Sequence, residues 1–227
     1  MGVIFALING VPLYIYPINN DGLNALKIKR DYKTKRDFWI KLKINEQLAK
    51  GKRLRDMPAE WFGVENRDHT SNPMNAAFNI LACMRAMDAL DFETAKKIGH
   101  YLLAHDKNLI GISRHNVTMV MIFCELIGEN RFYNIETLES KDFKKYIQAS
   151  SKLPEVNRFL YAYELFYHHD EQKAQKHLKD FEKAARNYPY EGAIENEREL
   201  LAYAQKTYKE KCKKAYVSQF NNIRTDS

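Results

Sequence analysis

Histidine is the residue type through which this sequence could most readily support metal chemistry. The chain has seven: His69, His100, His105, His115, His168, His169 and His177. A catalytic zinc ion on a helix usually takes two histidines four residues apart with a Glu between them, because that spacing aims both rings at one ion while the Glu activates its water. No two histidines here are four apart, and His100 and His105, five apart, diverge on a helix. The sequence therefore contains no complete site for a zinc protease.

Nucleophilic catalysis has equally little support. Ser113 precedes His115 by two residues, but Ser113 is predicted to be a helix N-cap. Cys124 lies in the most apolar stretch of the chain, where a thiol stays protonated and unreactive. It shares no short spacing with Cys83 or Cys212, and the sequence has no Gly-rich phosphate-binding loop. We expect no catalytic residue in this chain.

Basic residues are concentrated at two places in an otherwise nearly neutral sequence. Residues 27–43 carry a net charge of +6 and residues 206–214 a net charge of +4, whereas residues 44–205 carry a net charge of −2. The first cluster follows an apolar stretch, an arrangement typical of a segment at the inner face of a membrane, where basic residues attract anionic headgroups. The residues expected to bind the membrane surface are Lys27, Lys29, Arg30, Lys33, Lys35 and Arg36.

The same cluster has a second interpretation, because Tyr32, Phe38 and Trp39 are interleaved with the charges, as in nucleic-acid-binding surfaces. However, Phe38, Trp39 and Leu42 are predicted to form the buried stripe of a helix that ends at Gly51. This leaves few aromatic rings to stack on bases. We therefore favour a membrane surface over nucleic acid, and expect the C-terminal lysines to form a solvated helix face.

The pattern of apolar residues predicts an all-α protein. With 227 residues, 45% of them hydrophobic, the chain can bury one sizeable core or two small ones, which excludes a disordered tail or a disulfide-stapled mini-protein. From residue 74 onward apolar residues recur three and four apart, with N-caps predicted at Asp91, Ser140 and Asp170. The turns at Asp91, Asn130 and Asp170 are 39 and 40 residues apart, which is the length of one helical hairpin in a repeat.

Two of these hairpins resemble tetratricopeptide hairpins, whose small residues let two helices approach closely. The residues that carry the resemblance are Leu90 to Ala95 and the helix containing Ala174 and Ala185. The resemblance covers two of three units and implies stacked antiparallel hairpins with a concave face that binds a protein or peptide. An irregular helix bundle is the alternative.

The N-terminal part of the chain carries a second resemblance. Asn9 to Pro12 forms an Asn-x-x-Pro motif, and Asp21-Gly22 precedes a predicted helix. Residues 51–58 read Gly-Lys-Arg-Leu-Arg-Asp-Met-Pro. Together these resemble the third conserved motif of the M50, site-2-protease-type, intramembrane zinc metalloproteases, and the G-x-R-P-R-D-x-P stretch that follows it in many bacterial members. The resemblance covers residues 6–62.

This resemblance implies that Asp21 is the third zinc ligand of a site whose two histidines and general-base Glu are missing from this chain. A single carboxylate cannot hold a catalytic zinc ion, so we expect no cofactor and no catalysis in this chain alone. The alternative is a protease portion that binds zinc and becomes active only when a HExxH-bearing portion complements it.

These observations predict four regions along the chain. They are an apolar segment ending in Asp-Gly (1–22), basic juxtamembrane helices (23–62), a linker (63–73) and a helical-repeat domain (74–227). The predicted function is a protein-interaction or regulatory region associated with an M50-type membrane metalloprotease, cytoplasmic and at the inner face of the membrane. A basic helical RNA-binding protein is the second alternative.

Overall fold

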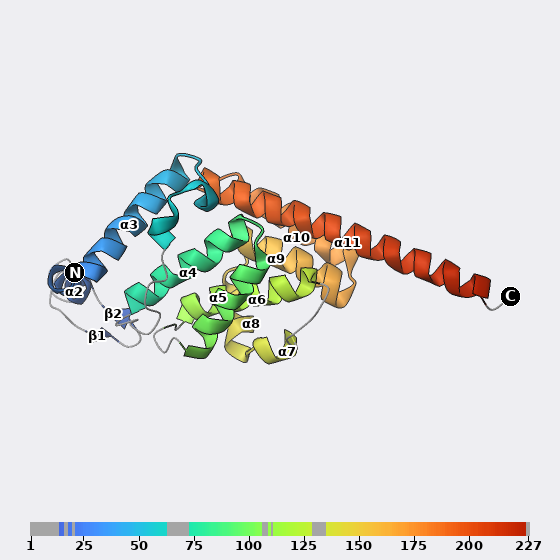
Figure 1. Ribbon diagram of the computed structural model, residues 1–227, viewed down its shortest axis with the longest axis horizontal. Coiled ribbons are helices and arrows are strands. Elements are labelled where there is room, and N and C mark those ends of the chain that lie inside the picture. Colours follow the sequence, from blue (N-terminus) through green and yellow to red (C-terminus); the bar gives the residue numbers. More distant parts are fainter. Residues whose placement is uncertain are drawn as a thin grey trace. The chain divides into compact units, whose positions relative to one another are not determined.

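The computed structural model describes residues 14–15, 18–19, 21–62, 73–105, 109, 111–128 and 135–225. Within this part of the chain, regular structure is helical except for one antiparallel pair of two-residue strands, β1 (Tyr14–Ile15) and β2 (Ile18–Asn19) (Figure 1). The all-α class predicted from the sequence is therefore confirmed. Two compact units, residues 1–118 and 119–227, divide within helix α6 (Gly111–Ile127). Of the helices that the structure describes, none has the length and apolar character needed to cross a membrane.

Unit 1, residues 1–118, is organised around helix α4. In chain order its helices are α2 (Asp21–Arg30), α3 (Tyr32–Ala49), the short 3-10 helices η1 (Leu54–Asp56) and η2 (Ala59–Phe62), α4 (Pro73–Asp88) and α5 (Phe92–His105). Helix α4 packs against α5 and also contacts α3, η1 and η2. Ile44, Leu54, Cys83, Ala95 and Leu102 are among the side chains that form the buried core of this unit.

Two turns of unit 1 follow the sequence predictions. Gly51 has a φ of 81°, so the chain leaves α3 in the left-handed conformation that glycine adopts without a steric penalty. Asp91 caps α5, because its Oδ1 accepts a hydrogen bond of 3.1 Å from the backbone N–H of Thr94.

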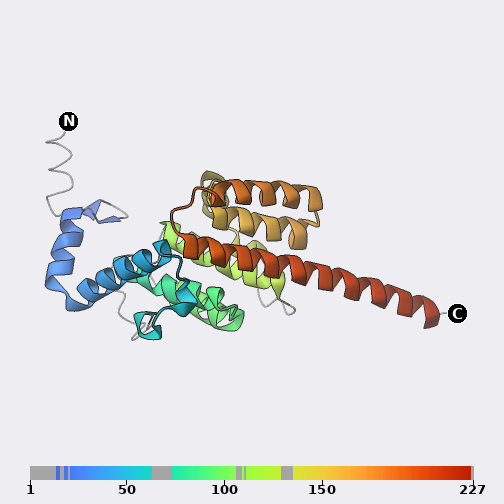
Figure 2. The same ribbon diagram turned by 90° about the horizontal axis from the view of Figure 1, so that it is seen from above.

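Unit 2, residues 119–227, is organised around helix α9. The elements of this unit that follow α6 are α7 (Ile135–Leu138), α8 (Lys141–Ala149), α9 (Pro154–Tyr163), the π-helix η3 (Glu164–His168), α10 (Glu171–Ala185) and α11 (Glu191–Thr225). Helix α9 runs beside α10 and also packs against α11 (Figures 1 and 2). Phe123, Phe159, Phe181 and Leu200 are fully buried. Every side chain of residues 119–127 is buried, in keeping with the apolar character of the stretch that contains Cys124.

The helix caps of unit 2 confirm two predictions, whereas a cap expected in α6 is wrong. Ser140 Oγ accepts a hydrogen bond of 3.0 Å from the backbone N–H of Phe143, and Asp170 Oδ1 accepts one of 2.9 Å from that of Lys173. Ser113, expected to be an N-cap, instead lies inside α6, which begins at Gly111. The earlier start follows from Gly111 itself, whose φ of 53° suits a turn into the helix.

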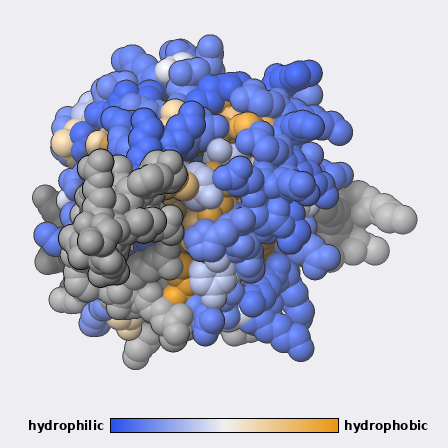
Figure 3. Space-filling model, turned by 90° about the vertical axis from the view of Figure 1, so that its right-hand side faces the viewer, coloured by the Kyte–Doolittle hydropathy of each residue, from blue (hydrophilic) through white to orange (hydrophobic). Residues whose placement is uncertain are grey.

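Part of the predicted organisation falls on residues outside the described part of the chain. These include residues 1–13 of the apolar segment, residues 63–72 of the linker and the turn at Asn130. On the face drawn in Figure 3, most described side chains are hydrophilic, and apolar side chains show chiefly in the recesses between them. This is the surface pattern expected of helices that bury their apolar sides against one another.

Candidate functional site

The basic cluster predicted to bind a membrane lies on two consecutive helices, α2 and α3, that meet at Asp31. One carboxylate oxygen of Asp31 accepts hydrogen bonds from both the backbone N–H and the hydroxyl of Thr34, at 3.2 and 2.5 Å. The Asp31 carbonyl also accepts a hydrogen bond of 3.0 Å from the backbone N–H of Lys35. Asp31 therefore caps α3, and the cluster falls on both sides of this cap.

Helix α3 turns a narrow side toward the core of unit 1. The buried side chains on this side are Thr34, Asp37, Ile40 and Ile44, which recur three and four residues apart. Helix α3 contacts α2 and α4. Because Ile40 and Ile44 are one turn apart, they supply the apolar contact, while Thr34 and Asp37 lie near the capped end.

The prediction that Phe38, Trp39 and Leu42 form the buried stripe of this helix is wrong. Their exposed fractions are 36, 54 and 52%, and that of Tyr32 is 82%. The physical reason is geometric: Trp39 and Leu42 project from the side of α3 opposite to Ile40 and Ile44, and only one side of the helix can face the core. The aromatic residues thus remain available at the surface.

Four of the six predicted basic residues are exposed. They are Lys29 and Arg30 at the end of α2, and Lys35 and Arg36 in the first turns of α3. The side chains of Lys27 and Lys33 lie outside the described residues. Spacings of three, four and seven residues bring the exposed basic and apolar side chains of α3 onto one side of the helix. We call this set the α3 surface: Tyr32, Lys35, Arg36, Trp39, Leu42 and Lys43.

Charges on the α3 surface are only partly neutralised. The Lys43 ammonium lies 5.7 Å from the centre of the Trp39 ring and 3.0 Å from Glu46 Oε2, and Lys50 lies 2.6 Å from the other Glu46 oxygen. These two hydrogen bonds lower the pKa of Glu46 to about 2, so Glu46 stays ionised. The guanidinium of Arg36 lies 3.9 Å from the buried Asp37 carboxylate, at the outer limit of an ion pair, and about half of the Arg36 side chain remains exposed.

Basic residues in the first turns of α3 do not stabilise the helix. The N-terminal end of a helix carries a partial positive charge, so Lys35 and Arg36 are slightly unfavourable there. Helix α3 has no acidic residue in its first turn. Exposed Trp, Tyr and Leu side chains next to Lys and Arg are the composition of helices that lie in a membrane interface. The sequence identified the charges but not the exposure of Trp39 and Leu42, because helical spacing fits two apolar stripes on α3 and does not say which one packs inward.

The segment resembling the second M50 stretch has a structural role in unit 1. Arg53 Nε donates a hydrogen bond of 2.8 Å to Asp88 Oδ1, at the end of α4. The backbone N–H of Arg55 donates one of 2.8 Å to Asp88 Oδ2. The Asp88 side chain is completely buried. Arg53 and Arg55 therefore attach the segment that follows α3 to the end of α4. The carboxylate that they bind, Asp88, was not predicted from the sequence to have this role.

Asp21, the zinc ligand implied by the M50 resemblance, is the first residue of α2, and its side chain lies outside the described residues. Among the side chains that the structure does describe, no three His, Cys, Asp or Glu residues gather in a group able to hold a metal ion. The described residues therefore do not fit a zinc site, and the expectation for Asp21 stays a prediction. Comparisons of the chain with protein-family models, with curated proteins and with solved structures found no match.

Proposed function

We propose that this chain is a non-catalytic helical interaction region that lies on an anionic membrane surface and binds a partner protein. The observation that carries the proposal is the α3 surface, where exposed Trp39 and Leu42 stand beside Lys35 and Arg36. Basic side chains are drawn to anionic headgroups, and the apolar side chains gain by leaving water for the headgroup boundary. The resemblance of residues 6–62 to M50 proteases supports a location beside the membrane portion of such an enzyme, at the inner face of the membrane.

Partner binding is assigned to the helical hairpins. Helices α4 and α5 form one such pair and α9 and α10 another. The small residues Ala95, Ala174 and Ala185 are buried, which supports the close approach of helices that tetratricopeptide hairpins require. We propose that each pair is a tetratricopeptide-like hairpin and that such hairpins present a concave face to a protein or peptide.

Vesicle binding tests the membrane role directly. We expect the chain to bind vesicles of phosphatidylcholine with about a third phosphatidylserine, and to bind pure phosphatidylcholine vesicles weakly. Each basic residue near the surface contributes about 1 kcal/mol, so Lys35→Gln with Arg36→Gln is expected to weaken binding roughly tenfold or more at low salt. Trp39→Ala with Leu42→Ala is expected to weaken binding by a similar factor that changes little with salt, because it removes apolar contact.

Control variants test whether the loss of vesicle binding is specific to the α3 surface or follows any loss of charge or of exposed apolar area. Lys52 and Lys97 are exposed, so Lys52→Gln with Lys97→Gln removes two charges elsewhere in unit 1 and is expected to have little effect. Ile112 is 67% exposed on α6, and Ile112→Ala is the control for loss of apolar surface. In a Trp61→Phe background, Trp39 is the remaining tryptophan, and its emission is expected to shift to shorter wavelength on binding. Absence of that shift would contradict insertion of Trp39.

RNA binding is the second candidate, and the exposure of Tyr32 and Trp39 favours it, because both rings are available for stacking. The same variants decide between the two. Salt-sensitive binding of single-stranded RNA, lost in Trp39→Ala and accompanied by no binding to anionic vesicles, would replace the membrane proposal with an RNA-binding function.

A further inference from the structure

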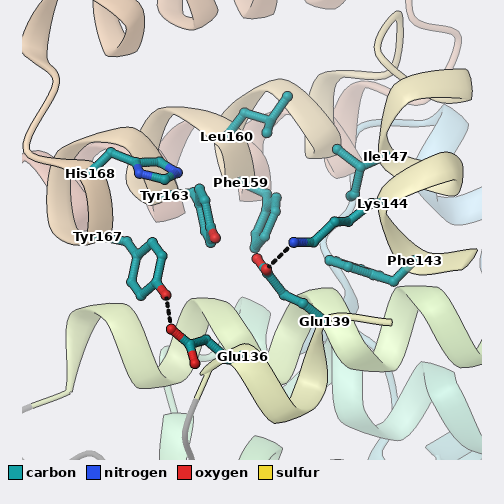
Figure 4. Close-up of a pocket in the computed structure, with 10 residues that line it drawn as sticks. All are labelled: Glu136, Glu139, Phe143, Lys144, Ile147, Phe159, Leu160, Tyr163, Tyr167 and His168. Atoms are coloured by element: carbon teal, nitrogen blue, oxygen red, sulfur yellow. Dashed lines mark hydrogen bonds and ion pairs between the residues drawn. The ribbon is translucent and has the colours of Figure 1, made fainter. Parts of the chain in front are cut away.

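A groove of about 490 Å³ opens in unit 2 between α8 and the continuous α9–η3 helix, and Glu136 and Glu139 also line it. This volume lies in the range of sites that bind small ligands or single side chains. Figure 4 labels its lining side chains, which include Glu136, Glu139, Phe143, Tyr163, Tyr167 and His168. We call it the aromatic groove. It combines ring faces with two carboxylates, a chemistry unlike that of the apolar core.

The rings form a continuous row that begins on α8 and runs along the α9–η3 helix. Phe143 meets Phe159 edge to face with centres 6.1 Å apart, and Phe159 lies 5.7 Å from Tyr163. Tyr163 lies 5.0 Å from Tyr167 and 5.1 Å from His168. In Figure 4 the rings of Phe159, Tyr163 and Tyr167 point from their helix toward Glu136 and Glu139.

The π-helix explains how two rings reach Tyr163 from the same chain. In an α-helix the residue four positions on lies above a given residue, whereas the residue five positions on lies on another side. The wider turn of η3 brings Tyr167 and His168, four and five positions on, to flank Tyr163. The turn closes at His169, whose φ of 56° is in the left-handed region. Single π-helical turns occur frequently at functional sites, which supports a binding role for this wall.

The carboxylates are held opposite the rings. Tyr167 donates a hydrogen bond of 3.1 Å to Glu136 Oε1, and this bond raises the pKa of the Tyr167 hydroxyl. Burial, together with the neighbouring Glu139 carboxylate, raises the pKa of Tyr163. Both phenols therefore stay protonated and can donate to the carboxylates at neutral pH. The Glu139 side chain is only 10% exposed, so its charge is directed into the groove rather than into bulk water.

The groove already holds one cation from its own chain. The Lys144 ammonium lies 3.0 Å from Glu139 Oε2 while 67% of the Lys144 side chain is exposed. Because most of the Lys144 side chain lies in water, its ammonium can leave Glu139 and become hydrated when another cation takes its place. The pair shows that a positively charged group fits beside Glu139.

We propose that the aromatic groove binds an arginine side chain of a partner polypeptide. The guanidinium group is planar and weakly hydrated, so it stacks on the faces of rings such as Tyr163 while its N–H groups reach a carboxylate in pairs. An acidic or phosphorylated ligand would be repelled by Glu136 and Glu139, and a purely apolar one would leave the buried charge of Glu139 without added compensation. The inference rests on the proposed partner-binding role and identifies the chemistry that the partner presents.

The test uses the full chain and two short peptides that differ in one group. One peptide carries a single central arginine between glycines and alanines, and the other carries citrulline, which has nearly the same shape without the charge. Titration calorimetry or tyrosine fluorescence is expected to show saturable binding of the arginine peptide, with the citrulline peptide at least tenfold weaker. Equal binding of the two peptides, or no saturable binding of the arginine peptide, would overturn the proposal.

Two variants are expected to act in opposite directions. Glu139→Gln is expected to weaken binding of the arginine peptide about tenfold, because it removes the buried charge. Lys144→Gln is expected to tighten it several-fold, since the competing ammonium is gone. The matched controls lie on α8 outside the groove: Lys145→Gln and Asp142→Asn, at side chains that are 68 and 80% exposed, are expected to change binding less than twofold.

Lys144→Gln keeps the test decisive even if Glu139→Gln fails to fold, because Lys144 is exposed and its loss leaves the core intact. Weaker binding in Lys144→Gln, or an equal gain in Lys145→Gln, would contradict the proposal. The soluble peptide needs no membrane, so a negative result here with intact vesicle binding refutes the arginine site alone. Loss of vesicle binding with intact peptide binding refutes the membrane role alone.

Discussion

At the scale of single residues, Glu155 on α9 is a carboxyl group whose environment opposes its charge. Burial and the nearby Glu197 raise the pKa of Glu155 above its ordinary value near 4.5, although Arg158 acts in the opposite direction. The same surroundings raise the pKa of Tyr188 to about 12, through burial and the charges of Glu155 and Glu197. Arg158 compensates chiefly Glu197, to which its Nε donates at 2.8 Å.

Glu155→Gln is therefore expected to stabilise unit 2 at neutral pH. A carboxyl group whose pKa is raised in the folded state stabilises that state when protonated, below the ordinary pKa, and loses the contribution as the pH rises through the raised value. The gain in melting temperature should thus be greatest near pH 7, amounting to a few degrees, and vanish near pH 4. Thermal melts across this range measure it. Glu195→Gln, at an exposed residue of α11, is the control, and a gain that is independent of pH would contradict the mechanism.

The sequence predicted single residues correctly where a short-range hydrogen bond fixes their role. It failed where either of two sides of a helix could pack against the core. The caps at Asp91, Ser140 and Asp170 follow from short-range hydrogen bonds, and the structure confirms them. The spacing of Phe38, Trp39 and Leu42 predicts a buried stripe, yet Ile40 and Ile44 are the side chains that α3 buries against the rest of unit 1. Which of two apolar stripes packs inward depends on the neighbouring helices, which the spacing within α3 does not specify.

At the scale of elements, the attachment of residues 53–55 to α4 depends on the buried side chain of Asp88. Asp88→Ala leaves the guanidinium of Arg53, itself only 13% exposed, without its carboxylate, and the expected cost is about 3 to 5 kcal/mol of unfolding free energy. Urea denaturation measures it. Asp56→Ala, at an exposed residue of η1, is expected to change stability by about 0.5 kcal/mol or less.

A double variant separates the charge from the backbone contact. Arg53→Met with Asp88→Leu replaces the ion pair by apolar groups and is expected to recover part of the loss. Recovery remains incomplete, because the backbone N–H of Arg55 loses the acceptor that it has in Asp88 Oδ2 at 2.8 Å. A cost below about 1 kcal/mol for Asp88→Ala would show that this contact does not hold the segment.

Helices were predictable from the sequence, whereas departures from regular helix were not. The pairing of α9 with α10 agrees with the helical spacing of apolar residues that the sequence shows from residue 74 onward, and Phe159 and Phe181 are buried in this pair. The π-helical turn at residues 164–168 has no signature in apolar spacing, because Tyr163 and Tyr167 also fit an α-helix. The aromatic groove depends on that turn and on Glu136 and Glu139, which lie at least 25 residues earlier in the sequence (164 − 139 = 25), so the pattern of either segment alone could not reveal it.

At the scale of the whole chain, the two candidate surfaces fall in different compact units. The α3 surface belongs to residues 1–118, and the aromatic groove to residues 119–227. Their chemistries are opposite, since one offers basic side chains and the other carboxylates. Substitutions that remove the α3 surface therefore leave the core of unit 2 unchanged, and substitutions in the aromatic groove leave the core of unit 1 unchanged. For this reason the lipid-binding variants and the peptide-binding variants can be interpreted independently.

The metal content of the whole chain distinguishes an interaction region from a protease portion. A catalytic zinc ion needs three protein ligands and an activating base, and the HExxH motif that would supply two of the ligands and the base is absent from the sequence. The chain purified alone is therefore expected to carry well under one zinc per molecule after equilibration with excess zinc and desalting, and to leave casein uncleaved. Mass spectrometry of the metal measures the first, and a fluorescent casein assay the second.

Asp21→Ala is the decisive variant for this expectation, and Asp56→Ala is its control at an exposed residue of the same unit. If the wild-type chain retains stoichiometric zinc that Asp21→Ala loses and Asp56→Ala keeps, Asp21 is a ligand in a site formed within this chain, and the non-catalytic proposal fails. If zinc binds only after a HExxH-bearing portion is added, and that binding depends on Asp21, the complemented-protease alternative replaces it. Both conclusions require that zinc binding depends on Asp21. Zinc adsorbed by surface histidines would instead be retained or lost equally in Asp21→Ala and Asp56→Ala.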